Sequence, residues 1–328
     1  MNEPLRPLNL GEILDRTLEI YRAQFLVFFG IAALPAGVVL AIASASLLFF
    51  FWFGSGASAL ASPFLAGVVA LVFFAALLLV GFPACVGAAA LGTAALNHTA
   101  AHAYRDDQLS IRAAYKLAWK HGWRYLWLYV LQSLLVFVAP MIAWNLALLL
   151  ATMAGALGVG AGGALAGIVA IAGGVGLAVW FFLALVRLWM AFPVCVVEQT
   201  GAWDAIKRSY LLSQGARGRI FVLWLLGAVL SYLLSLALAL PLMVAIELIP
   251  GMNTPLHAEL AGTLMLYIFF GAFFAVQALT RPVYAIALLL FYYDQRIRRE
   301  GFDIEWLMQK AGMLPEPQPE AQTAVDDR

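Results

Sequence analysis

Two long stretches without charge constrain the fold of this chain more than any other feature of its sequence. No Asp, Glu, Lys or Arg occurs in the 82 positions between Arg22 and Arg105, or in the 62 positions between Arg124 and Arg187. About 20 apolar residues cross a bilayer once, so each stretch is long enough for two crossings and a turn. The sequence therefore predicts an all-α, polytopic membrane protein.

Composition excludes a water-soluble fold. Only 11% of the 328 residues are charged and the mean hydropathy is +0.92, whereas a soluble domain has roughly 25% charged residues. The chain thus has too few ionic side chains to cover a soluble surface. Its net charge of +1 gives no reason to expect a nucleic-acid partner. Cys85 and Cys195 both lie beside a proline in apolar sequence, so we expect no disulfide.

The apolar segments divide into six spans within a transmembrane domain of residues 25–300. They are predicted at residues 25–53, 63–96, 123–152, 164–188, 220–246 and 260–293. Residues 1–24 are predicted to form a cytoplasmic amphipathic helix and to lack a cleaved signal. Residues 301–328 are predicted to form a short helix and a disordered cytoplasmic tail.

The basic residues indicate the orientation of these spans. If the N-terminus is cytoplasmic, all 19 Lys and Arg residues fall on the cytoplasmic side and none falls in the three external turns. The external loop after the fifth span then holds Glu247 and Glu259. By the positive-inside rule we expect both termini in the cytoplasm.

The cytoplasmic segments are related to one another. When they are aligned on Leu18, Trp119 and Tyr210, a small residue stands one position earlier and apolar residues stand four and eight positions earlier. This spacing predicts three amphipathic helices, each preceding an odd-numbered span. Asn9 and Ser110 are suitable N-caps for two of them.

The even-numbered spans each carry a proline within a similar tetrapeptide. Pro83, Pro193 and Pro282 occupy these positions and are predicted to kink the helices. Together with the surface helices, they suggest a threefold internal repeat of surface helix, span, turn and proline-bearing span. The Ala- and Gly-rich segment of residues 87–101 predicts close helix packing.

One group of side chains has the spacing of a metal site. His98, His102 and Asp106 are four residues apart and would share one face of a helix. They also lie among other polar residues where the second span leaves the membrane, and this second interpretation is favoured. We expect no metal and no cofactor.

Few polar side chains lie within the spans. Arg281 is the one ionisable residue with long apolar runs on both sides, and as part of an intramembrane functional site it would need a partner among Glu247, Glu259, Asn145 and Gln277. Helix rise from Leu260 places Arg281 about 31 Å along the span, which favours anchoring at the cytoplasmic interface. The amides of Gln132, Asn145 and Gln277 are expected to make hydrogen bonds between helices.

Aromatic residues concentrate at the start of the third span. The members of this band are Trp119, Trp123, Tyr125, Trp127 and Tyr129. Their position predicts an interfacial aromatic belt.

Three cytoplasmic motifs resemble a known family. They are LRPLNLGEILDRT at residues 5–17, AIKRSY at 205–210 and FYYDQRIRREGFD at 291–303. With six spans, the chain resembles the bacterial glycerophosphoryl diester phosphodiesterase membrane domain over about residues 5–305. In the enzymes that give the family its name, a separate soluble barrel carries out hydrolysis. This sequence has no segment for a barrel of about 250 residues, so the resemblance implies a stand-alone domain in the bacterial plasma (inner) membrane.

Two classes of function remain. No phosphate-binding loop, metalloprotease motif or serine elbow is present, so catalysis is not expected. The first class is a non-catalytic module whose basic surface helices bind anionic membrane lipids or a membrane protein partner. The residues predicted for this surface are Arg16, Arg112, Lys116, Lys120, Lys207 and Arg208. The alternative is a transporter or channel for a small solute or lipid, which the repeated proline-bearing spans would suit. The sequence does not indicate an oligomeric state.

Overall fold

The described part of the chain is helical apart from short connections. This computed structural model describes residues 7–56, 62–105, 107–156, 162–248 and 258–301. Its elements are α1 (Leu10–Ala23), α2 (Phe25–Gly56), α3 (Pro63–Ala76), the π-helical segment η2 (Leu77–Gly81), α4 (Phe82–Ala103), α5 (Ile111–Lys120), α6 (Gly122–Ser133), the π-helical segment η3 (Leu134–Val138), α7 (Ala139–Ala156), α8 (Gly162–Leu188), α9 (Ala191–Val197), α10 (Ala202–Ser213), α11 (Arg217–Glu247) and α12 (Ala258–Glu300).

The predicted fold class is confirmed. No strand occurs among the described residues, and six helical stretches there are long and apolar enough to cross a membrane. The short helix predicted within residues 301–328 lies outside the described part.

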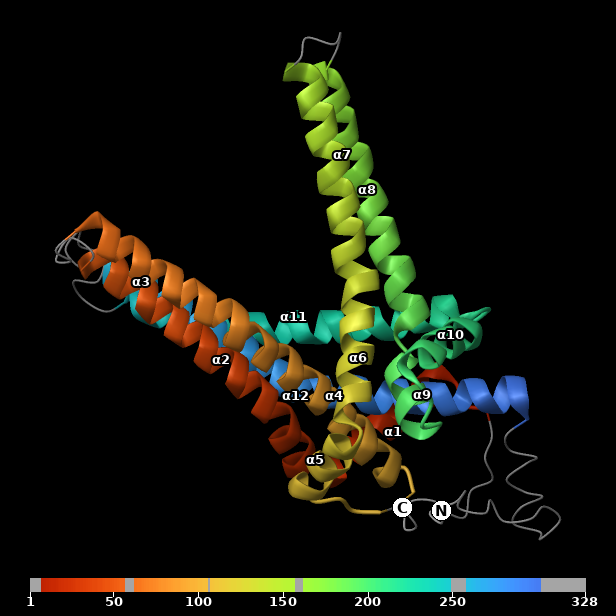
Figure 1. Cartoon of the computed structure of the whole chain (residues 1–328). Coiled ribbons are helices and arrows are strands. Elements are labelled where there is room, and N and C mark those ends of the chain that lie inside the picture. Colours follow the sequence, from red (N-terminus) through yellow and green to blue (C-terminus); the bar gives the residue numbers. More distant parts are fainter. Residues whose placement is uncertain (1–6, 57–61, 106, 157–161, 249–257, 302–328) are drawn as a thin grey trace, which may run out of the picture.

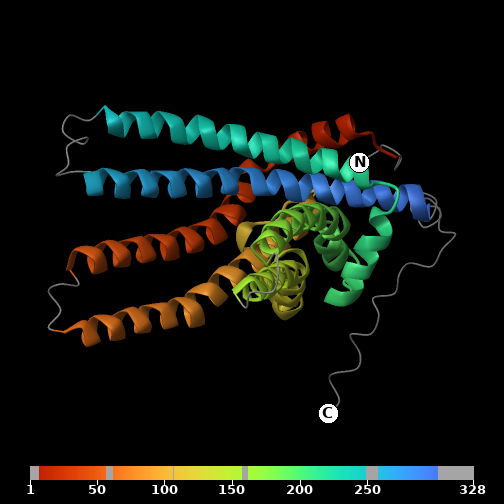
Figure 2. The same cartoon turned by 90° about the horizontal axis from the view of Figure 1, so that it is seen from above.

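The six long helical stretches form three hairpins that leave a common hub (Figure 1). The first hairpin pairs α2 with α3–η2–α4, the second pairs α6–η3–α7 with α8, and the third pairs α11 with α12. The hub consists of α1, α5, α9, α10 and the C-terminal halves of α4 and α12. The second hairpin leaves the hub in a different direction from the other two, so that Figure 2 views it nearly along its axis.

The order of elements repeats three times, and equivalent positions of the surface helices have equivalent surroundings. α1, α5 and α10 each precede one hairpin. Ile13, Ala114 and Ala205 are equivalent in the sequence alignment, and all three are fully buried. The small residues four positions later, Thr17, Ala118 and Ser209, are buried too. The apolar face predicted for each surface helix therefore packs into the hub.

The C-terminal half of α12 runs through the centre of the hub. This helix has 43 residues and is therefore about 65 Å long, roughly twice the ~30 Å hydrocarbon thickness of a bilayer. All eight consecutive side chains from Ala285 to Tyr292 are buried. Eight residues cover more than two helical turns, so protein surrounds this segment on every side.

The small residues of α4 allow close packing, as expected. Eleven residues between Ala89 and Ala103 are buried, most of them Ala, Gly or Thr. A Cβ atom at Gly92 would lie 2.7 Å from the ring of Pro35 in α2. Only glycine allows these two helices to approach so closely.

The prolines of the even-numbered spans differ in their surroundings. Pro83 is exposed and follows the π-helical segment η2, whereas Pro193 is buried in α9 after a break between α8 and α9. Pro282 is also buried, and α12 continues through it. The three prolines therefore have different environments. The second π-helical segment, η3, precedes Pro140, whose missing N–H frees a carbonyl one turn earlier.

Candidate functional site

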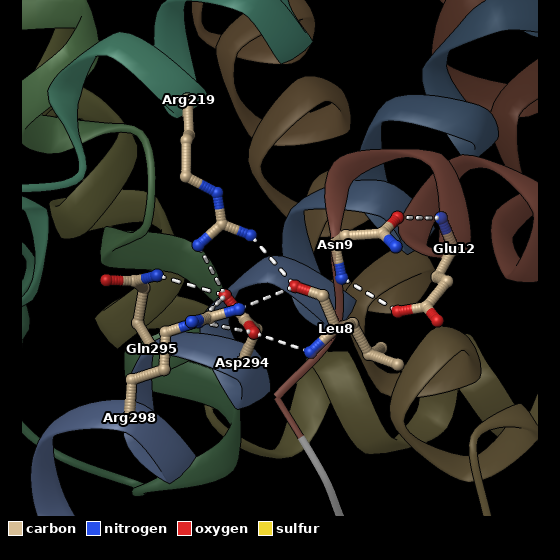
Figure 3. Close-up of polar contacts among 7 residues, drawn as sticks. All are labelled: Leu8, Asn9, Glu12, Arg219, Asp294, Gln295 and Arg298. Carbon is tan, nitrogen blue, oxygen red and sulfur yellow. Dashed lines mark hydrogen bonds and ion pairs between the residues drawn. The ribbon is translucent and has the colours of Figure 1, made fainter.

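Two of the three sequence motifs meet around a buried carboxylate that joins the two ends of the described chain (Figure 3). We call the cluster around it the terminal clasp; its members are Leu8, Arg219, Asp294 and Arg298. The Asp294 carboxylate is fully buried and accepts hydrogen bonds from the Leu8 N–H and Arg219 Nη1, both at 2.9 Å. Arg298 Nε donates to the same carboxylate at 2.9 Å.

The clasp also satisfies the Leu8 carbonyl. It accepts hydrogen bonds from Arg219 Nη2 at 3.0 Å and from Arg298 Nη2 at 2.9 Å. Each guanidinium therefore bridges the carboxylate and the backbone of the N-terminal segment. Asn9 caps α1 directly after Leu8, as predicted, and forms a capping box with Glu12.

The third motif contributes to a neighbouring ion cluster. Arg208 pairs with Glu198, with Nε 3.3 Å from a carboxylate oxygen, and also with Glu300. Tyr292 donates a hydrogen bond to Glu198 at 2.8 Å. These contacts join α10, the segment after α9 and the end of α12. Described residues of all three motifs thus hold the hub together, and Arg208, which was predicted for the lipid surface, has a structural role here.

α5 lies firmly against the first hairpin. Ser110 caps it as predicted, accepting a hydrogen bond from the Ala113 N–H at 3.2 Å. The Tyr115 hydroxyl donates to the Ile31 carbonyl at 2.8 Å, and burial raises the pKa of Tyr115 to about 12, so the donor stays protonated. Ala114 and Ala118 are completely buried on the same side of the helix. These contacts fix the rotation of α5 about its axis, and they therefore determine which of its side chains face outward.

That outer surface carries a ridge of cations. Arg112, Lys116 and Lys120 are exposed and four residues apart, so they lie along one side of α5. None of them makes an ion pair with a residue that the structure describes. Their charges remain available to an anionic ligand.

Exposed tryptophans lie beside this ridge and continue along α6. Trp119, Trp123 and Trp127 are 74%, 79% and 51% exposed. We define the α5 face as these three tryptophans together with Arg112, Lys116 and Lys120.

The predicted aromatic belt is only partly correct. Tyr125 is buried, and His98 lies 3.0 Å from its hydroxyl. Tyr129 is half-buried, with its ring edge against Phe192. The alternation along α6 therefore separates outward-facing tryptophans from inward-facing tyrosines.

An open cavity of about 550 Å³ borders the start of α5. It lies where α1 joins α2, and its walls combine polar and apolar side chains. The residues lining it include Arg22, Gln24, Phe25, Leu26, Gln108 and Ser110. Such a cavity suits a molecule with a polar head and an apolar tail.

The remaining cations of the predicted lipid surface already have acidic partners. Arg16 pairs with Glu19, and Lys207 Nζ lies 4.0 Å from an Asp204 oxygen. Lys207 also lies over the exposed Trp203 ring, 5.9 Å from its centroid. Of the six cations predicted for the lipid surface, the three on α5 are therefore those without an acidic partner among the described residues.

Arg281 lies at the level of the surface helices. Tyr21 of α1 donates a hydrogen bond to the Leu279 carbonyl at 3.0 Å, two residues from Arg281. Arg281 Nε itself donates to Gln277 Oε1 at 3.4 Å. This position favours an interfacial role for Arg281.

The histidines of the suggested metal site face different partners. His98 contacts Tyr125, whereas His102 Nδ1 lies 3.6 Å from an Asp107 oxygen. Asp106 lies outside the described residues. Among those described, no group of three or more His, Cys, Asp or Glu side chains could hold a metal ion.

A substitution at Gly30 tests how α5 is held. A Cβ atom there would lie 2.5 Å from Ile111 Cδ1, so Gly30→Leu would force the start of α5 away from α2. We expect this overpacking to lower the free energy of unfolding by about 1–3 kcal/mol and to increase proteolysis near residue 110. Gly37→Leu is the control, because a Cβ atom there meets nothing within 4 Å. Equal proteolysis of the two variants would contradict the close packing of α5 against α2 at Gly30.

Comparison with known proteins yields no match to a protein family, to a curated protein or to a solved structure.

Proposed function

We propose that this integral membrane protein is a non-catalytic module that binds anionic phospholipid headgroups through the α5 face. One observation carries the proposal: Arg112, Lys116 and Lys120 form an exposed ridge without described acidic partners, beside exposed tryptophans. This combination occurs where a surface helix leads into an apolar helix long enough to cross the bilayer.

The interaction energies of these residue types support placing the α5 face at the membrane surface. Each Lys or Arg near an anionic leaflet contributes about 1 kcal/mol of attraction. Tryptophans favour the interface because their rings are apolar and their N–H groups remain near water. With cytoplasmic termini, as the basic residues predict, the α5 face would meet the cytoplasmic leaflet. The cavity beside Arg22 and Ser110 would then receive the headgroup and glycerol region of a lipid.

Stepwise delipidation tests the proposal. The protein would be purified from membranes containing phosphatidylglycerol and phosphatidylethanolamine, and the retained lipids identified by native mass spectrometry. We expect phosphatidylglycerol to remain bound after phosphatidylethanolamine has been lost. Retention of the two lipids in their bulk ratio would contradict the proposal, and a retained protein would instead favour a protein partner.

A second candidate, movement of a lipid or small solute, rests on a different cavity. A space of about 330 Å³ lies between the second and third hairpins. Its walls include the aromatic Tyr129, Trp189, Trp224 and Tyr284 and the polar Gln132 and Ser133. Flux of polyols, ions or fluorescent phosphodiesters into proteoliposomes, reduced by Ser133→Trp, would support this candidate. Absence of flux across the panel would count against it.

A further inference from the structure

The amides that were expected to join helices, Gln132, Asn145 and Gln277, make different hydrogen bonds. Gln132 Nε2 donates to the Leu188 carbonyl at 2.7 Å, joining the α6 stretch to the end of α8, and Gln277 accepts a hydrogen bond from Arg281. Asn145 is exposed, and its Nδ2 donates to the Met141 carbonyl of its own helix at 2.8 Å. Among the described residues it has no interhelical partner.

The position of Asn145 makes this exposure costly. α7 ends at Ala156, eleven residues later, so the amide lies about 16 Å from the outer end of the helix. This is about half of the ~30 Å hydrocarbon core. An amide group in contact with lipid chains at that depth has no water to compensate its remaining donor and acceptor.

Asn145 belongs to a regular outward-facing stripe. Ile142, Asn145, Leu149 and Thr152 follow one another at spacings of three, four and three residues, and all are exposed. We call these four residues the α7 seam. The side chains that face α8, such as Trp144 and Ala151, lie about 100° around the helix from their exposed sequence neighbours Asn145 and Thr152. The second hairpin also extends away from the other two, so the seam is accessible (Figure 1).

We propose that the α7 seam is the contact surface for a second copy of this chain. Alternating spacings of three and four residues form the contact line of a left-handed helix pair, and a single Asn in such a line fixes its register. An amide both donates and accepts, so it can pair with its own copy across a twofold axis. A second copy with the same orientation places its Asn145 at the same depth.

Single-molecule subunit counting in liposomes tests this assignment over a range of protein densities. We expect wild-type protein to dimerise and Asn145→Leu to raise the dimer dissociation constant roughly 3- to 30-fold. Asn145→Gln should retain most of the association. Because the site is exposed, the thermal stability of the monomer should be unchanged in both variants. Monomeric wild type at every density, or equal association of Asn145→Leu, would overturn the proposal.

Disulfide cross-linking gives a second, geometric readout. In a Cys85→Ala background, Leu149→Cys should form an intermolecular disulfide, while the native Cys195 is buried and should stay unreactive. Ile171→Cys on α8 is the matched control, since it is 74% exposed and lies at a similar distance from the outer end of the hairpin. Equal cross-linking at both positions would show random collisions and would overturn the assignment.

Discussion

Replacing Asp294 by alanine is expected to lower the free energy of unfolding by about 1.5–3 kcal/mol. The side chain is completely buried and accepts hydrogen bonds from Leu8, Arg219 and Arg298. Its removal would leave the Leu8 N–H without its acceptor, and each of the two guanidinium groups would keep, among the described residues, only its hydrogen bond to the Leu8 carbonyl. Denaturation in sodium dodecyl sulfate, followed by circular dichroism, measures the change.

Asp15 provides the matched control for this substitution. It is an exposed aspartate on α1, and Asp15→Ala should change the free energy of unfolding by less than about 0.5 kcal/mol. The N-terminal segment before α1 should also become more sensitive to protease in Asp294→Ala. Similar stabilities of the two variants would refute the structural role given to the terminal clasp.

Neutralising the α5 ridge is expected to weaken the binding of phosphatidylglycerol roughly 100-fold. The variant Arg112→Gln/Lys116→Gln/Lys120→Gln removes three exposed cations, each worth about 1 kcal/mol near an anionic leaflet. The fold should be unaffected, because none of the three makes an ion pair with a described residue. Binding to detergent-solubilised protein would be measured by titration with a fluorescent phosphatidylglycerol.

A pair of double variants tests whether lipid binding depends on where these cations lie or only on the total positive charge of the protein. Lys116→Gln/Lys120→Gln should weaken binding about 30-fold. Arg16→Gln/Lys207→Gln removes the same charge from positions that already have acidic neighbours, and it should change the affinity less than about 5-fold. The difference should decrease in high salt, which screens exposed charges. Equal losses of affinity for phosphatidylglycerol in both double variants would mean that no local site exists on α5.

The sequence predicted those features that local spacing determines. Long stretches without charge indicated the six candidate spans because few arrangements can accommodate so many apolar residues. The caps at Asn9 and Ser110 were also predicted correctly, since a cap depends on residues within one turn. The buried faces of the surface helices followed from their apolar period.

Contacts between distant segments could not be predicted in the same way. Asp294 and Leu8 are 286 residues apart, and nothing in their neighbouring sequence identifies the partner. Arg208 resembled the other surface cations because its pairing with Glu198 and Glu300 depends on how α10 packs. Tyr125 likewise could not be separated from the neighbouring tryptophans without knowing which side of α6 faces the hub.

The most direct test of the α5 face is to locate a bound anionic lipid. A photoactivatable phosphatidylglycerol with its reactive group near the headgroup would be cross-linked to the protein in liposomes, and the labelled peptides mapped by mass spectrometry. We predict labelling concentrated in residues 107–127 and 22–27, and its loss in the Arg112→Gln/Lys116→Gln/Lys120→Gln variant. Equal labelling of α1, α5 and α10, or labelling unchanged in that variant, would contradict the proposed lipid-binding function.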